Sequence, residues 1–334
     1  YQTGLNGHLR LDEGINTNFD SWHPIDSRIF ERMINLQPTF PVYNSDGTYA
    51  QLNGTNTENP VELNNHRTED RKRHRFLGYM KAELQIIDGL SATMNTSYEF
   101  NSVKSGLYKP TYARMEGQSE KGWGQRLYDD YTNKQLELYL TYDKKFADIH
   151  HLNLMGGYSY LDNIYEGFSA TRSGYDSDAF GYNNLGAGSD YRQGDAGSYK
   201  GGSKLISFFG RVNYSLLDRY MLTATLRRDG SSRFGENHKW GVFPSVSFAW
   251  RISEEPFMAS TRDWLDNLKL RAGFGVTGNQ NGIGEYKSLS ILSAAGSAYY
   301  DGATNTWKNS YTQIQNPNPD LKWESTAQWN LGVD

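Results

Sequence analysis

The sequence predicts an all-β protein: a partial transmembrane antiparallel β-barrel with long extracellular loops and short periplasmic turns. Two observations carry this prediction. In about ten stretches of strand length, apolar residues fall on every second position, which gives a strand two unlike faces. The connections between these stretches alternate between tight turns and long polar loops, as they do in the wall of a membrane barrel.

The stretch 205–217 shows the alternation. Phe208 and Val212 fall on one face, whereas Ser207 and Arg211 fall on the other. The same period of two recurs at 219–229, 240–252 and 267–277. A strand with one apolar and one polar face meets two different environments, which in a membrane barrel are lipid and lumen.

Composition narrows the alternatives. The chain has 334 residues, of which 37% are hydrophobic, and its mean hydropathy is -0.74. It has no run approaching the roughly 20 apolar residues that a membrane-spanning helix needs. The net charge of -4 gives no electrostatic reason to expect a nucleic acid as partner. The lack of cysteine excludes disulfides and cysteine-ligated zinc.

The first half of the chain predicts strands at 3–13, 75–87, 90–100, 133–146 and 150–162. Asp88-Gly89 is a strong signal for a two-residue hairpin turn, and a second short turn is expected near Ala147-Asp148. The long polar loops of this half are expected at 14–73, 101–132 and 163–203.

The second half predicts strands at 205–217, 219–229, 240–252, 267–277 and 322–333. A tight turn is expected at 217–219, and loops are expected at 230–239 and 278–321. Pro244 lies inside a predicted strand and cannot donate a ladder hydrogen bond, so a β-bulge is expected there.

Two irregular features are also predicted. The segment 27–36 is expected to form a short helix, because Ile29, Met33 and Leu36 would share one side. The segment 253–266 is expected to form a short helix or structured turn at the tight-turn end of the strands.

Aromatic residues favour a membrane setting over a soluble sandwich. They gather near both ends of the apolar faces, where the two interfaces of a bilayer would lie. The tight-turn end has Tyr142, Phe146, Tyr214, Tyr220 and Trp250, and the loop end has Tyr98, Phe100, Tyr158 and Tyr160. The other face carries arginines such as Arg211 and Arg227, which suit a wet or plugged lumen better than a dry core.

Several motifs resemble one known family. These are SFFGRVNYSLLDRYMLTATLRRDGSSRFGENHKWGVFPSVSFAWRISEEPFM (207–258), LKLRAGFGVTGNQ (268–280) and NPDLKWESTAQWNLGVD (318–334), with looser matches in PTFPVYNSDGTYA (38–50) and NPVEL (59–63). They resemble the SusC/RagA-type TonB-dependent outer-membrane transporters of Bacteroidetes. The resemblance implies a 22-stranded, plugged barrel in the cell outer membrane, powered by TonB and capped by a SusD-like lipoprotein. Such pairs import oligosaccharides or peptides.

The resemblance also implies how the chain is organised. We expect residues 1–334 to be part of the barrel domain, about ten strands of the larger barrel, with the plug domain and the TonB box absent. Two alternatives stay open. The first is a complete ten-stranded barrel that acts as a porin or adhesin, and the second is a soluble all-β carbohydrate-binding protein.

No catalytic triad, paired-carboxylate motif or metal-ligand spacing is found, so we expect neither an enzyme nor a cofactor nor a bound metal. The acidic loop residues Asp46, Asp176 and Asp178 are interpreted most simply as solvated turn residues, ahead of a calcium site. Substrate contacts, if any, are expected from ring and polar side chains on two long loops. These are Tyr108, Tyr112, Trp123 and Arg126 on 101–132, and Tyr299, Tyr300, Asp301, Asn305, Trp307 and Tyr311 on 278–321. The competing interpretation, which we weigh above direct contact, is that these rings pack the loops together or against the lid subunit.

Overall fold

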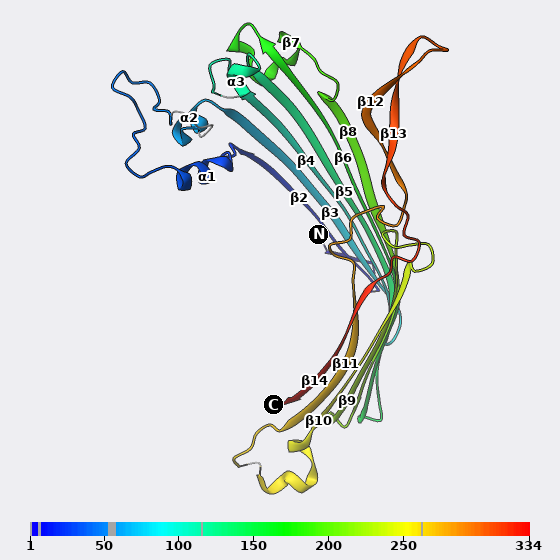
Figure 1. Cartoon of the computed structure of the whole chain (residues 1–334). Helices are drawn as coiled ribbons and strands as arrows, with labels where there is room; N and C mark the ends of the chain where they lie inside the picture. The colour runs from blue at the N-terminus through cyan, green and yellow to red at the C-terminus, as the bar shows by residue number, and fades with distance from the viewer. Residues whose placement is uncertain (1, 6–7, 53–57, 115, 262) are drawn as a thin grey trace.

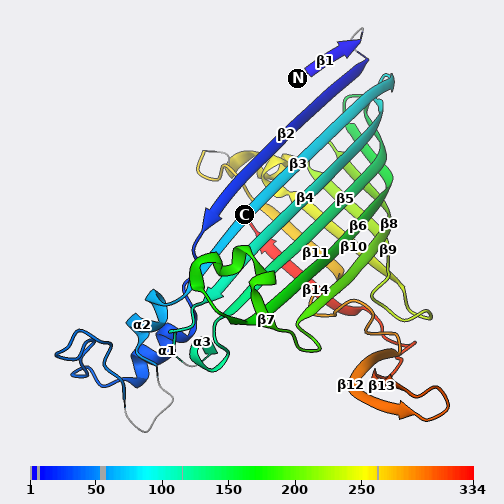
Figure 2. The same cartoon turned by 90° about the horizontal axis from the view of Figure 1, so that it is seen from above.

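The chain forms one curved, open antiparallel sheet with its loops gathered at one end, as the computed structural model in Figure 1 shows. The structure describes residues 2–5, 8–52, 58–114, 116–261 and 263–334. Seen from above, the long strands cross the sheet diagonally, and short helices lie at the loop end of the first strands (Figure 2).

Neighbours in the sheet are also neighbours in sequence almost throughout, as expected for an up-and-down barrel wall. In order, the strands are β1 (Gln2–Leu5), β2 (Leu9–Trp22), β3 (Thr68–Ile87), β4 (Leu90–Lys109), β5 (Trp123–Phe146), β6 (His150–Tyr175), β8 (Ala196–Leu216), β9 (Tyr220–Ser231), β10 (Trp240–Arg251), β11 (Lys269–Asn279) and β14 (Glu324–Val333). The order begins at β1 and ends at β14, and these two strands do not pair with each other in the part of the chain described. The closed ten-stranded barrel considered above is therefore not the observed structure.

The register confirms the predicted alternation, because it places apolar residues side by side across five strands. Ala82 pairs with Met94, which pairs with Leu138, and the row continues through Tyr158 to Phe208. All five lie on one face, since directly paired residues of a sheet share a face.

The opposite face carries a polar row in the same strands. Asn95, Glu137, Ser159, Ser207 and Asp229 are paired in sequence across β4, β5, β6, β8 and β9. Asn95 Nδ2 donates to Glu137 Oε2 at 3.3 Å within this row, and Arg227 Nη2 donates to the Ser207 hydroxyl at 2.8 Å. The face therefore satisfies part of its own hydrogen-bonding capacity, as polar groups next to a confined lumen require.

Six strands extend further at their loop ends than predicted. β5 has 24 residues and β6 has 26, whereas 133–146 and 150–162 were expected. The loops shrink accordingly to 23–67, 110–122 and 176–195. The predicted loop bounds are wrong because polar residues occupy both faces of these extensions, so no alternation marks them as strands.

We name two parts of the sheet. The wall is the part whose two faces differ: residues 9–17, 76–87, 90–100, 132–146, 150–164 and 202–216 together with β9, β10, β11 and β14. The rim is the loop-end part, residues 18–75, 101–131 and 165–201, which includes the helices α1 (Arg28–Asn35), α2 (Pro60–Asn65) and α3 (Glu116–Ser119). It also includes the 3-10 helices η1 (Asp178–Asn183) and η2 (Leu185–Ala187) and the short strand β7 (Gly188–Asp190), which pairs with β6.

The tight turns are where the sequence placed them. Ala147 and Asp148 both have positive φ, of 48° and 58°, and so do Leu217 and Asp218, at 55° and 53°. Positive φ at both central residues is the geometry of a type I′ hairpin turn. Position 89 requires glycine for two reasons. Its φ is 81°, and a Cβ there would lie 2.6 Å from the carbonyl oxygen of Asp143.

Helix predictions are confirmed in part. α1 fills the predicted 27–36, whereas 253–266 holds 3-10 turns, η3 (Ile252–Glu254) and η4 (Pro256–Thr261), and is thus the structured turn of the two options. This turn is fastened by Glu255, which accepts hydrogen bonds from Tyr220 Oη at 2.5 Å and Trp250 Nε1 at 3.0 Å. No helix within the described ranges is long and apolar enough to cross a membrane.

Two predictions in the second half are wrong. No bulge interrupts β10 at Pro244, which stays in register with Leu226 of β9. The β10–β11 pairing begins only at Ser245. Pro244, which has no N–H to donate, therefore lies where β10 makes no ladder hydrogen bonds to β11. The expected loop 278–321 contains a separate hairpin, β12 (Ile291–Asp301) and β13 (Thr306–Gln315), which pairs with no other described strand.

Buried apolar side chains lie at the loop ends rather than along the wall. In the rim they include Tyr108 and Tyr175. Above β9 and β10, Phe234 is 1% exposed, and its ring lies 4.5 Å from that of Trp323. Apart from Phe243 near the loop end of β10, no apolar side chain of the wall is buried to this degree, because each face of the wall is a surface of the sheet.

Candidate functional site

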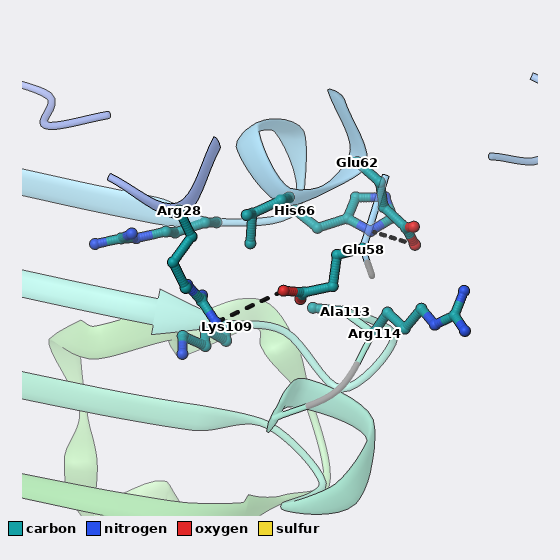
Figure 3. A pocket seen from close by; sticks show the side chains of 9 residues that line it. Arg28, Glu58, Glu62, His66, Lys109, Ala113 and Arg114 are labelled. Atoms are coloured by element: carbon teal, nitrogen blue, oxygen red, sulfur yellow. Dashed lines mark ion pairs between the residues drawn. The ribbon is translucent and has the colours of Figure 1, made fainter. Parts of the chain in front are cut away.

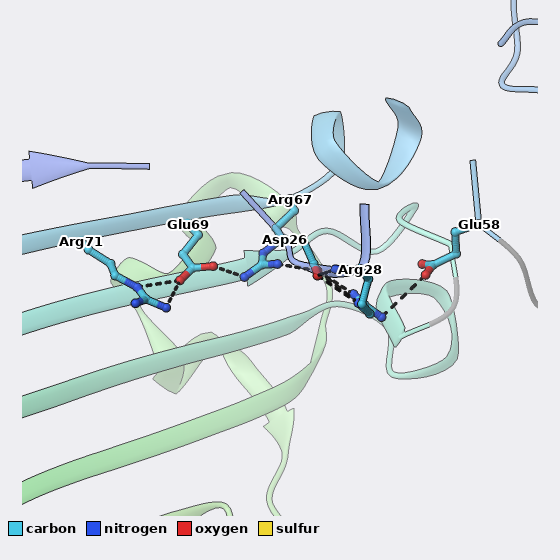
Figure 4. A network of polar contacts seen from close by, with 6 residues as sticks. All are labelled: Asp26, Arg28, Glu58, Arg67, Glu69 and Arg71. Atoms are coloured by element: carbon cyan, nitrogen blue, oxygen red, sulfur yellow. Dashed lines mark hydrogen bonds and ion pairs between the residues drawn. The ribbon is translucent and has the colours of Figure 1, made fainter. Parts of the chain in front are cut away.

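A chain of ion pairs fastens the first loop of the rim to β3 (Figure 4). Its centre is Asp26, which is only 8% exposed and is paired with both Arg28, at 2.8 Å, and Arg67. Arg67 also pairs with Glu69, whose other carboxylate oxygen accepts from Arg71 Nε at 2.9 Å. Removing any one partner would leave the opposite charge half-buried and uncompensated, which is costly.

The pKa of Asp26 reflects this setting. Burial raises it, but hydrogen bonds from Arg28 and the charge of Arg67 outweigh burial and bring the pKa to about 2. Asp26 is therefore ionised at every pH at which the protein would work, and the loop 23–67 is held by a permanent charge.

The cavity next to these ion pairs is too small for an organic ligand. It lies between α2 and the end of β4, where Arg28, Glu58, Glu62, His66 and Lys109 approach one another (Figure 3). Its volume is about 20 Å³, which is room for roughly one water molecule. We interpret it as a packing gap between the loop and the sheet.

Lys109 also lines a larger cavity of about 330 Å³. The register pairs Lys109 with Trp123, Trp123 with Ser173 and Ser173 with Asp190, so one row crosses β4, β5, β6 and β7. The Lys109 ammonium lies 5.2 Å from the centre of the Trp123 ring. The row has the same parity as the polar row of the wall, so both lie on the polar side of the sheet.

Of the predicted contact residues, Tyr108 serves packing. It is 4% exposed, and its hydroxyl donates to Asp178 Oδ1 at 2.8 Å. Asp178 also accepts from the backbone N–H and the hydroxyl of Thr111, each at 2.8 Å. The expectation that Asp178 is a solvated turn residue is therefore wrong, because it joins two loops of the rim.

Tyr112 and Arg126 pack against neighbours at the rim surface. Tyr112 is exposed, and its ring meets His66 edge-on at 4.9 Å. The Arg126 guanidinium lies 5.4 Å from the ring of Tyr182 and donates to the Tyr128 hydroxyl at 2.9 Å. Trp123 alone among the four lines the larger cavity.

The other predicted residues lie on the β12–β13 hairpin, apart from the helices α1, α2 and α3 of the rim in both views (Figures 1 and 2). Tyr300 donates to Asn305 Oδ1 at 2.7 Å, and Asp301 pairs with Lys308. Tyr299, Trp307 and Tyr311 are exposed, the last two at 70% and 69%. The structure thus divides the predicted site into two groups that do not meet.

The residues that the sequence did not single out are Lys109, Ser173 and Arg192. Each lies in a stretch predicted as loop, where no period indicates which side chains share a face. Within the described ranges no group of three or more histidine, aspartate or glutamate side chains could hold a metal ion.

The β-barrel family model described as "TonB dependent receptor-like, beta-barrel" matches residues 12–334. The chain belongs to this family. A TonB-dependent receptor of Formosa agariphila is 32% identical over 337 residues, which cover 100% of this chain and 33% of that protein. TonB-dependent receptor SusC of Bacteroides thetaiotaomicron is 43% identical over 143 residues, or 41% of this chain and 14% of SusC.

Solved structures share the fold. The RagAB peptide transporter superimposes with a TM-score of 0.81 at 18% identity, covering 99% of this chain and 37% of that one. The RagAB peptide importer in its closed-closed state gives a TM-score of 0.80 at 19% identity, with the same coverage. The chain spans about a third of the length of the Formosa receptor.

Proposed function

We propose that this chain is one section of the barrel wall of a TonB-dependent importer of the outer membrane. The importer would take up oligosaccharides or other large nutrients, peptides included, and would act with a SusD-like surface lipoprotein. The remaining strands, the plug domain and the contact with TonB would come from other parts of a longer protein. Transport rather than catalysis is its role, and no cofactor is involved.

One observation carries the proposal: the open sheet of this barrel family has one apolar face and one polar face. Apolar rows such as Ala82–Met94–Leu138 suit lipid, and the polar row opposite suits a lumen. The edge of β2 is paired with β1 only at Leu9–Asp12, so its residues 13–22 lack a described neighbour on that side. Bare strand edges cost several kcal/mol per unpaired group in hydrocarbon, so further strands must cover them.

The predicted contact residues remain proposals within this function. Trp123 is the one whose position, at a cavity on the polar side of the sheet, supports contact with cargo. Tyr108, Tyr112 and Arg126 support the rim by packing. The exposed rings of the β12–β13 hairpin would meet the lipoprotein or its cargo.

The test uses the full-length receptor in its own cells. We expect it in the outer-membrane fraction, with a heat-modifiable band on gel electrophoresis and a lipoprotein that co-purifies with it. Deleting its gene should abolish growth on one class of complex nutrient, and blocking TonB should do the same. A protein that leaves disrupted cells in soluble, monodisperse form would instead support the soluble carbohydrate-binding alternative.

A further inference from the structure

The apolar face of the sheet ends in a row of cations where the wall meets the rim. On this face, the first lysine, arginine, aspartate or glutamate toward the loop end is basic on β3, β4, β5, β8 and β9. These residues, which we call the basic belt, are Lys72, Lys104, Lys134, Lys204 and Arg228, and all of them are exposed. On β6 the corresponding residue is Asp162, which the register places between Lys134 and Lys204.

The carboxylates of this face do not compensate the basic belt. No carboxylate within the described ranges forms an ion pair with any residue of the belt. Above the apolar rows, the other charged residues of the same face are Arg126, Arg172, Lys200, Asp70, Asp130, Asp162 and Glu166. Glu166 is already paired with Lys200 at 2.8 Å, and Asp70 with His23 at 2.6 Å. Cations therefore exceed carboxylates on this face.

The excess is most direct where two lysines are neighbours. Lys72 of β3 is paired in register with Lys104 of β4, and like charges directly opposite each other destabilise a sheet. Tyr128 follows in the same row, and the Lys104 ammonium lies 5.8 Å from the centre of its ring. Arg126 Nη2 donates to the Tyr128 hydroxyl at 2.9 Å. An anion between the two lysines would turn a repulsion into two attractions.

Tyr128 reports the same positive potential. The hydrogen bond from Arg126 lowers the pKa of Tyr128, and although burial acts in the opposite direction, the charges of Arg126 and Lys104 lower it further. Tyr128 belongs to the rim, beyond the apolar rows, so its hydroxyl lies outside the hydrocarbon. A negative group is therefore favoured at this place on the outward face.

The height of the belt indicates which negative group meets it. The apolar face of β8 runs from Ile206 to Leu216, which is close to the roughly 9–11 residues that a tilted strand needs to cross a bilayer. Lys204 is the next residue on that face, so it lies at the level of the lipid head groups. Nearby, the Arg228 guanidinium lies 4.8 Å from the centre of the Trp240 ring. Because lipid covers this face below the belt, a lipid head group lies beside it.

We propose that the basic belt binds the phosphate groups of a phosphorylated glycolipid in the outer leaflet of the membrane. One phosphate would lie between Lys72 and Lys104, and others would lie beside Lys204 and Arg228. The apolar face below has an open hollow of about 560 Å³, whose lining includes Leu138, which offers room for acyl chains. The inference rests on the outer-membrane location in the proposed function and goes beyond it, because the partner is a lipid rather than cargo.

The test is calorimetric titration of the full-length receptor, freed of lipid in a neutral detergent, with a matched pair of lipids. Diphosphoryl lipid A is compared with the same lipid A after removal of both phosphates, so that the acyl chains are identical. The phosphorylated form should bind about tenfold or more tightly, as charge-assisted hydrogen bonds predict. Inorganic phosphate at the same concentration should not displace it, because inorganic phosphate lacks the acyl chains.

A double variant locates the effect, and a matched double variant controls it. Lys204→Gln with Arg228→Gln should reduce the preference for the phosphorylated lipid several-fold and leave binding of the dephosphorylated lipid unchanged. Lys145→Gln with Arg211→Gln removes the same two residue types from the polar face of the sheet and should change neither affinity. A heat-modifiable band for each variant shows that it is folded.

The lysine pair gives a second, independent measurement. Lys72→Gln with Lys104→Gln should also reduce the preference for the phosphorylated lipid. In detergent without lipid A, the same variant should resist denaturant at least as well as the natural receptor, because it loses a repulsion between neighbours. Diphosphoryl lipid A should then raise the resistance of the natural receptor more than that of the variant.

The proposal is overturned if the two forms of lipid A bind equally. It is also overturned if the belt variants keep the full preference, or if the variant of the polar face loses it. Displacement of lipid A by inorganic phosphate would assign the belt to free phosphate and refute a lipid site. In each of these cases a receptor that still inserts into the outer membrane and supports nutrient uptake would leave the import function standing.

Discussion

The wall and the rim are built from the same strands, yet different forces hold them. In the wall, one face of each strand is apolar and the other polar, and stability depends on matching each face to lipid or lumen. In the rim, β3 begins with Thr68–Arg75, whose eight residues include charges on both faces. In the rim, the backbone hydrogen bonds between strands continue outside the lipid. Half-buried ion pairs such as Asp26–Arg67 join the loops to these strands.

The difference shows that a barrel strand does not end where the membrane ends. Hydrogen bonding between β5 and β6 continues without a break from Phe146–His150 at the tight turn to Trp123–Ser173 at the cavity. The wall fixes the backbone path of the strands, and the rim uses that path to carry polar side chains above the bilayer. Substitutions should therefore act by different rules in the two parts.

The largest expected contrast is that the rim is accessible to a reagent added outside the cell, whereas the tight turns are not. The natural chain has no cysteine, so single cysteines report position without interference. Asp190→Cys in the rim should be labelled on intact cells by a membrane-impermeant reagent, and Asp218→Cys at the tight turn 217–219 should not. We expect 88–89, 147–149 and 253–266 to behave like position 218. Labelling at 218 without labelling at 190 would reverse the orientation of the sheet.

Within the wall, the two faces should differ in tolerance. Leu138→Arg places a charge in the middle of an apolar row and should destabilise the full-length barrel in lipid by about 2–4 kcal/mol. Glu137→Arg, one residue away on the polar face, should cost much less. Leu270→Arg should cost only about 0–1 kcal/mol, because Leu270 pairs with Trp250 at the tight-turn end, close to the interface. Equal losses for Leu138→Arg and Glu137→Arg in an unfolding titration would refute the assignment of faces.

Within the rim, charge should matter more than apolar contact. Asp26→Asn keeps the shape of the side chain but leaves Arg28 and Arg67 without their shared carboxylate. We expect limited proteolysis of the loop 23–67 in the full-length receptor to become about tenfold faster, because local opening becomes easier. Asp46→Asn changes an exposed turn that bonds only locally to Thr48 and serves as the control. Equal cleavage rates for the two variants would mean that the ion pairs do not fasten the loop.

The wall could be predicted from sequence because alternation records two different environments. Nine strands and the turns at 88–89, 147–148 and 217–218 follow from that period and from turn chemistry. The predicted strand 3–13 is wrong, because residues 3–5 belong to β1 and residues 9–13 to β2, and these two strands pair antiparallel. The strand extensions at the loop ends could not be predicted, because a strand with water on both sides does not require apolar and polar residues to alternate. The β12–β13 hairpin was missed for the same reason: its exposed rings and polar residues lack a consistent apolar face.

The candidate site shows a second limit of the sequence. Trp123 was identifiable as a loop aromatic, but its partners were not, since Lys109 and Ser173 are neighbours only through the register of β4, β5 and β6. In the rim, where the residues do not alternate, the register of each strand pair is the one already set in the wall. Sequence reasoning that stops at the last apolar residue therefore cannot place these side chains in one row.

The strand extensions also bear on how such a receptor can change over evolutionary time. Their backbones are fixed by hydrogen bonds that any residue except proline can make, and their side chains touch neither lipid nor a large core. A replacement at Lys109, Trp123 or Ser173 would change the lining of the cavity without disturbing insertion into the membrane. One barrel could in this way give rise to many receptors with differently lined cavities, while the part that spans the membrane stays the same.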